Sequence, residues 1–94
     1  MKELNLDTKV QGNSSNLNVE VLNDELVIMD FIEGNYILLN KMGKIIWEEI
    51  SAPILISDLI DILMKKFDVN YEICSRETLL LLNKLNNHNI LIVS

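Results

Sequence analysis

The chain has 94 residues, of which 49% are hydrophobic, and 14 acidic against 8 basic side chains give it a net charge of −6. A chain of this length holds one hydrophobic core and no second domain. It lacks the basic excess with which DNA-binding folds normally neutralise phosphates, so the composition disfavours nucleic acid as a partner.

Cysteine and histidine are too scarce for an internal disulfide or for most zinc sites. Cys74 is the only cysteine and His88 the only histidine, whereas a structural zinc site takes four ligands, mostly of these two types. A single thiol is typical of a reducing compartment. The N-terminus has no apolar signal-peptide run, and the longest apolar stretch, residues 79–82, is too short to cross a bilayer. We expect a soluble, cytoplasmic protein without metal, cofactor or membrane contact.

Residues 1–16 predict a flexible N-terminal arm that precedes a folded domain over residues 17–94. The arm ends in the polar, turn-rich run 12–16. Within it, residues 8–11 have the composition of a short edge strand.

Three strands are expected next. Apolar side chains alternate with other residues over 17–22, which is typical of a strand with one buried face. Residues 26–32 and 36–39 are rich in strand-forming types. Asn23-Asp24 and Gly34 supply the two turns, because these residue types tolerate left-handed backbone conformations. Two consecutive hairpins predict an antiparallel meander.

The apolar spacing becomes helical after Asn40, whose side chain is a good helix N-cap. Apolar residues recur at helical spacing over 42–50, and Pro53 ends that segment. Ser57 is expected to cap a second helix that reaches about residue 67.

Asn70 is expected to cap a third helix, from about residue 71 to 88. Asn89 follows it and suits the left-handed conformation that commonly ends a helix. Residues 90–93 predict a short extended tail. The whole order predicts an α+β fold of the winged helix–turn–helix type, in which a three-stranded antiparallel meander precedes three helices.

No motif in the sequence points to catalysis. No nucleotide-binding loop, metal cluster or pair of catalytic carboxylates occurs at a recognisable spacing. Cys74 would need an activating base to act as a nucleophile, and His88 lies about four turns away on the same predicted helix. We interpret Cys74 as a buried structural thiol and expect no enzymatic activity.

The third predicted strand and the third predicted helix form a candidate peptide site. The strand has no proline, lysine or inward charge that would block pairing with another chain, as β-strand addition requires. On the helix, a row beside the expected core face presents apolar and charged side chains. Which side chains of the strand face the site stays open, because a one-residue slip exchanges the two faces. The candidate peptide-binding residues are Asn35, Tyr36, Ile37, Leu38, Leu39, Ile73, Arg76, Glu77, Leu80 and Lys84.

A longer pattern resembles the PqqD-like family over nearly the whole chain. The residues that make up this pattern are 25–30, the run Gly34 to Asn40, Gly43, Ile46-Trp47-Glu48, Leu59, Phe67-Asp68-Val69, Leu85 and Asn89-Ile90-Leu91, with Leu6 to Val10 upstream. The likeness rests on the joint spacing of these elements. Asn89 stands where the family usually has glycine, and asparagine is the next-best residue for that backbone.

The resemblance implies a precursor-peptide recognition element of the biosynthesis of ribosomally made, post-translationally modified peptides. Such elements bind the leader segment of the precursor as a fourth strand, on the third strand and against the third helix. The core peptide then passes to separate enzymes. The chain is similar to free-standing members that act with lasso-peptide proteases and cyclases, and other free-standing members act with radical-SAM enzymes.

Two other interpretations remain open. A winged-helix transcription regulator would place its third helix in the major groove, although that helix has two acidic side chains beside its two basic ones. A homodimer could form through the exposed strand edge or the leucine-rich part of the third helix, and it is compatible with peptide binding.

Overall fold

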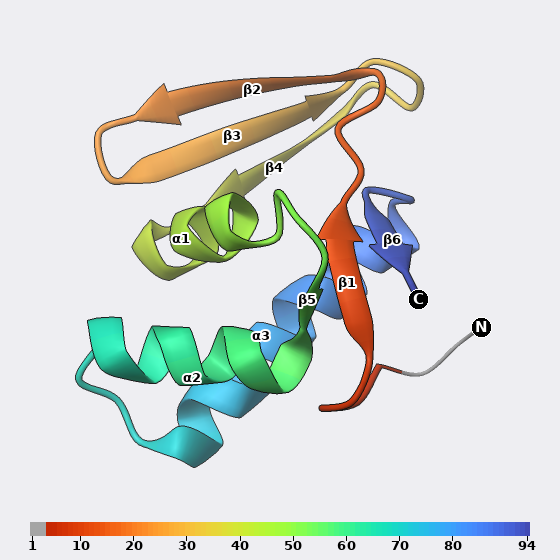
Figure 1. Ribbon diagram of the computed structural model, residues 1–94. Coiled ribbons are helices and arrows are strands. Elements are labelled where there is room, and N and C mark those ends of the chain that lie inside the picture. The colour runs from red at the N-terminus through yellow and green to blue at the C-terminus, as the bar shows by residue number, and fades with distance from the viewer. Residues whose placement is uncertain (1–3) are drawn as a thin grey trace.

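Two small antiparallel sheets and three helices make up the part of the chain that the structure describes, residues 4–94 of a computed structural model (Figure 1). The β2-β3-β4 sheet lies over α1, and α2 and α3 lie on the other side of α1 from this sheet (Figure 1). The elements in chain order are β1 (Lys9–Gly12), β2 (Leu17–Leu22), β3 (Glu25–Asp30), β4 (Asn35–Leu39), α1 (Lys41–Glu49), β5 (Ile54–Leu55), α2 (Ile56–Lys66), α3 (Tyr71–Asn87) and β6 (Leu91–Val93).

The predicted meander is the larger sheet, with strand order β2-β3-β4. A two-residue turn joins Leu22 to its partner Glu25, and Asn23 in this turn has the positive φ of 56° that such hairpins need. Gly34, with φ of 73°, closes the second hairpin. The α+β class, the three-stranded antiparallel meander and the three helices after it are confirmed.

Strand β3 ends two residues before the predicted boundary. Asp30 turns the chain, because its Oδ1 accepts hydrogen bonds from the backbone N–H groups of Ile32 (2.9 Å) and Glu33 (3.4 Å). Phe31 and Ile32 therefore lie in the turn and are exposed, although their residue types favour strands.

The N-terminal segment differs from the predicted flexible arm. From Leu4 onward it packs against the domain, and residues 1–3 lie outside the described part. Strand β1 is the central strand of the second sheet, with order β5-β1-β6, and Val10 is only 1% exposed. The sequence pattern predicts an edge strand at most, because both partners are short and lie more than 40 residues away along the chain.

Two of the three predicted helix caps are confirmed. Asn40 Oδ1 accepts from the Gly43 N–H at 2.9 Å, and Asn70 Oδ1 accepts from the Ile73 N–H at 2.8 Å. The predicted Ser57 cap is wrong, since α2 already begins at Ile56 and no side chain caps it. The first N–H groups of α2 instead donate to the main chain, from residue 56 to Thr8 O at 2.9 Å and from residue 57 to Leu6 O at 3.0 Å.

The core lies between the inner face of the β2-β3-β4 sheet and the three helices. Buried residues of β3 and β4 face it from the sheet, and α2 presents four fully buried aliphatic side chains. Cys74 and Thr78 are buried on α3, and the Thr78 hydroxyl donates to the Cys74 carbonyl at 2.7 Å. The largest fully buried side chains of the core are Ile28, Ile46, Ile50, Ile56, Leu59, Ile60, Leu63, Leu82, Leu85 and Ile90.

We expect Asn40→Ala to lower the free energy of unfolding by about 1 kcal/mol, because the substitution leaves an N-terminal N–H of α1 without its cap. Ser57→Ala is the matched control and should change stability by less than about 0.5 kcal/mol. Urea denaturation monitored by circular dichroism measures both values. Equal losses in the two variants would contradict this account of how α1 and α2 begin.

Candidate functional site

Strand β4 is an edge strand whose side chains hold it to the core. It pairs with β3 on one side and has no strand on its other side within residues 4–94. Ile37 and Leu39 point inward and are buried, with Ile37 only 4% exposed. Tyr36 and Leu38 point to the outer face, where Tyr36 is 74% exposed. The question of facing that the sequence leaves open is thus answered by the structure.

The backbone of β4 presents hydrogen-bonding groups at its free side. Just beyond the β2–β3 ladder, the Phe31 N–H donates to Asn16 O at 3.3 Å. Counting back by twos from Phe31 to Glu25, alternate residues therefore direct their backbone N–H and C=O groups to β2. The remaining β3 residues are Leu26, Ile28 and Asp30. They direct their backbone N–H and C=O groups to their partners on β4.

On β4 those partners are Asn35, Ile37 and Leu39. It follows that the N–H and C=O groups of Tyr36 and Leu38 point away from β3, toward the open edge. No hydrogen bond from elsewhere in residues 4–94 reaches the backbone of these two residues. Four main-chain groups are therefore available to another chain.

A groove of about 550 Å³ runs beside this edge. Residues at the end of β4 form one wall, the first turns of α1 form the floor, and α3 forms the opposite wall. Most of its surface is apolar, with charged side chains at Glu25, Glu77 and Lys84. The lining residues are Glu25, Leu38, Leu39, Asn40, Met42, Gly43, Ile46, Val69, Ile73, Glu77, Leu80, Leu81 and Lys84.

Gly43 lets α1 lie close to both β4 and α3. A Cβ atom at this position would lie 3.0 Å from Leu39 Cβ and 3.4 Å from Leu81 Cδ2. Glycine inside a helix costs about 1 kcal/mol relative to alanine, so its place in the first turn of α1 is a sequence signal of close approach. The sequence therefore signals a close approach at Gly43, and the structure shows that β4 and α3 are the elements that approach it.

Six of the ten candidate residues meet in this groove, namely Leu38, Leu39, Ile73, Glu77, Leu80 and Lys84. Asn35, Tyr36 and Ile37 lie on β4 but do not line it. Arg76 lines a second hollow on α3 that shares Leu80 with the groove.

The lining residues that the candidate set omits are Glu25, Asn40, Met42, Gly43, Ile46, Val69 and Leu81. Most of them come from the start of α1. A strand edge and a helix face define two walls of a groove, and the pairing of residues far apart in the sequence decides what lies between them.

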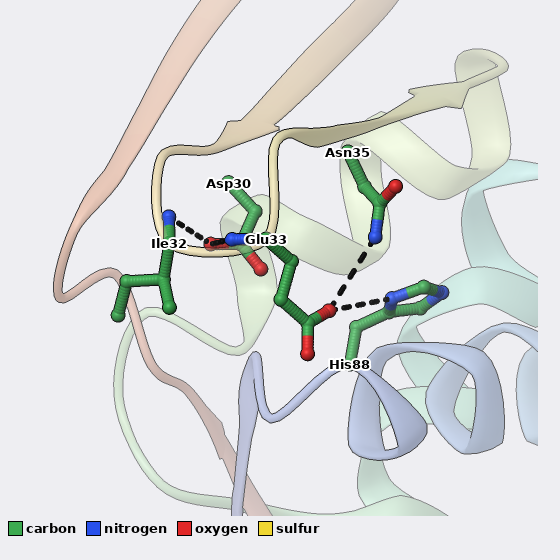
Figure 2. A network of polar contacts seen from close by, with 5 residues as sticks. All are labelled: Asp30, Ile32, Glu33, Asn35 and His88. Atoms are coloured by element: carbon green, nitrogen blue, oxygen red, sulfur yellow. Dashed lines mark hydrogen bonds and ion pairs between the residues drawn. The ribbon is translucent and has the colours of Figure 1, made fainter.

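A polar network ties the β3–β4 turn to the end of α3 (Figure 2). Glu33 Oε2 lies 3.8 Å from His88 Nδ1 and accepts from Asn35 Nδ2 at 3.4 Å. Asp30 holds the same turn through its two backbone hydrogen bonds. The start of β4 thus lies next to the end of the helix that forms the far wall of the groove.

The family comparison covers the elements that form the edge and the groove. The family model for "Coenzyme PQQ synthesis protein D (PqqD)" matches residues 25–91, which include both groove-forming elements β4 and α3. The chain belongs to the PqqD family. The resemblance drawn from the sequence pattern is therefore confirmed.

A solved structure shares the fold of this PqqD-family chain. It is titled "TbiB1 in Complex with the TbiA(beta) Leader Peptide", and it superimposes with a TM-score of 0.74 at 21% sequence identity. The match covers 86% of this chain and 94% of that one. No curated protein matches the sequence.

The described part of this PqqD-family chain contains no cluster of three or more histidine, cysteine or acidic residues that is suited to a metal ion. None of the helices in residues 4–94 is both long and apolar enough to traverse a membrane. Cys74 is buried, as expected of a structural thiol.

We expect the leucines of α3 to divide into groove and core residues. Leu80 is 59% exposed in the groove, so Leu80→Ala should change the free energy of unfolding by less than about 0.5 kcal/mol. Leu82 is fully buried, and Leu82→Ala should cost about 2–5 kcal/mol. Chemical denaturation of both variants tests the assignment, and a large loss for Leu80→Ala would show that this leucine serves the fold.

Proposed function

We propose that this chain is a non-catalytic recognition element for the leader region of a ribosomally synthesised precursor peptide. The leader adds as a fourth strand to β4, with its groove-side residues against α3. The bound precursor is then delivered to separate modifying or processing enzymes. Those of lasso-peptide pathways, a protease and a cyclase, are the favoured partners, and a radical-SAM maturase is the other class.

The observation that carries this proposal is the open edge of β4 beside an apolar groove. Tyr36 and Leu38 offer two N–H donors and two C=O acceptors in line, which is the pattern that an incoming strand pairs with. An apolar groove next to such an edge adds pockets for alternate side chains of the same strand.

Magnitudes show why both features are needed. Each net hydrogen bond contributes about 0.5–1.5 kcal/mol, so the four bonds to Tyr36 and Leu38 give about 2–6 kcal/mol. A micromolar complex requires about 8 kcal/mol, before the cost of ordering the leader. Apolar burial at about 25 cal/mol per Å² must supply the rest. The exposed Ile73 and Leu80 of the groove are the side chains that can provide it.

The comparisons support the proposal in two ways. PqqD-like proteins include precursor-peptide recognition elements, and TbiB1, which has the same fold, was solved with a leader peptide. A role in capture and delivery requires no catalytic group, which fits a chain whose single thiol is buried.

Binding to β4 predicts that Leu38→Pro weakens leader binding by at least about tenfold, since proline removes an outward donor and the bonds next to it. Proline is tolerated on an edge strand where its missing N–H faces outward, so the variant should fold. Fluorescence anisotropy with labelled leader peptides from short open reading frames beside the gene measures the affinity.

The matched control is Val21→Pro on the opposite edge of the same sheet. Val21 also directs its N–H outward, because its neighbours Glu20 and Leu22 bond to β3. This variant should bind the leader as the unmodified chain does. Equal affinities of a folded Leu38→Pro variant and of Val21→Pro would exclude β4 as the docking edge, and no binding of any neighbouring leader would remove the function itself.

A further inference from the structure

The groove beside β4 has charged side chains of opposite sign at its two ends. Three charged residues line it, the acidic Glu25 and Glu77 and the basic Lys84. In residues 4–94 the only contact within 4 Å between an acidic and a basic side chain joins Glu33 and His88. The three groove charges are therefore available to a ligand.

The order of these charges follows from the course of α3, which runs opposite to β4 (Figure 1). His88, just after α3, contacts Glu33, just before β4, so Lys84 lies toward the start of β4. Glu77 is two turns earlier on α3 and lies toward the end of β4. Glu25 lies at the same end, because the register places it beyond the pair of Leu26 and Leu39.

The spacing of the charges sets a pattern for an extended ligand. Seven residues of helix separate Glu77 from Lys84, a rise of about 10.5 Å, and Leu80 lies between them. Residues four apart on one face of a strand are about 13 Å apart, with another residue of the same face midway. The long side chains of Glu77 and Lys84 can span the difference between the helix rise and the strand length. The ligand then carries its charges at the first and fifth positions and an apolar side chain at the third.

We propose that the groove reads the charge order of the leader, a specificity that rests on the proposed leader capture. The β2-β3-β4 sheet is antiparallel throughout, and antiparallel pairing is the more stable arrangement. A leader antiparallel to β4 enters at Glu77 and leaves at Lys84. The recognised segment therefore reads, from its N-terminus, basic, any residue, apolar, any residue, acidic. Glu77 and Lys84 determine the charges, and Leu80 with Ile73 accepts the apolar side chain.

General attraction between an acidic protein and a basic peptide gives a different result. The net charge of −6 favours any basic peptide regardless of the order of its residues. Two peptides of identical composition, with lysine and glutamate exchanged, have the same net charge. Only a local reading of charge distinguishes them.

The test is a display library of twelve-residue, threonine-rich peptides in which three alternating positions are randomised. The library is selected for binding to the full chain. Binders count only if Leu38→Pro abolishes their binding, which ties them to the edge of β4. We expect enrichment of the basic–apolar–acidic order. Synthetic peptides of the two charge orders should differ by about three- to tenfold in Kd, as expected of two exposed ion pairs, and the difference should shrink in high salt.

The double variant Glu77→Lys with Lys84→Glu should enrich the reversed order. Both side chains are exposed, and thermal denaturation checks that the variant folds. Edge-dependent binders without a charge order, or with the same order in the double variant, would overturn this inference and leave leader capture intact. If no binder depends on Leu38, strand addition itself fails, and the charge order fails with it.

Discussion

The rest of this structure depends on β4, an edge strand. Its inward side chains are buried, while its backbone is open along one side. Inward side chains at Ile37 and Leu39 fix β4 to the core. The main-chain groups of Tyr36 and Leu38 stay free on the other side. Natural proteins usually protect such edges with lysine, proline, bulges or a covering element. Strand β4 has none of these residues and no bulge in its register, which is the arrangement that a strand-binding protein requires.

The other elements keep the second wall of the groove in place. Helix α3 contacts α2 and is followed by β6, which pairs with β1 in the second sheet. Asn89 reverses the chain between them with φ of 60°, and the Ile90 N–H donates to Leu85 O at 2.9 Å. The second sheet thus joins β1 to β6 and anchors the C-terminal end of α3. A groove between independent elements would otherwise vary in width, and ordering it would reduce binding affinity.

Local patterns predict most of the fold, because the meander, its turns and the N-caps of α1 and α3 depend on residues that are neighbours in the sequence. Period-two alternation identifies β2, and the asparagines at 40 and 70 identify the starts of α1 and α3. One error is local, since the Asp30 side chain ends β3 two residues early, and the others come from contacts between distant segments. The strand at β1 is central rather than part of an arm because β5 and β6 flank it, and α2 starts without Ser57 because residues 6–8 satisfy its first N–H groups.

The candidate site follows the same rule. The edge strand comes from its residue types and the row on α3 from helical periodicity, and six of their residues do line one groove. Arg76 lies in a separate hollow because it directly precedes Glu77, and one residue along a helix is a rotation of about 100°, which takes it out of the row. The floor formed by Met42, Gly43 and Ile46 depends on how α1 packs between β4 and α3, which no local pattern contains.

Amide hydrogen exchange measured by NMR on the full chain, with and without a saturating leader peptide, shows directly whether the leader adds to β4. If it does, the Tyr36 and Leu38 amides exchange quickly in the free protein and become strongly protected in the complex. The outward amides of Val19 and Val21, on the opposite edge, should be unchanged. Protection of that opposite edge, or a saturated complex in which the two β4 amides still exchange quickly, would contradict the account.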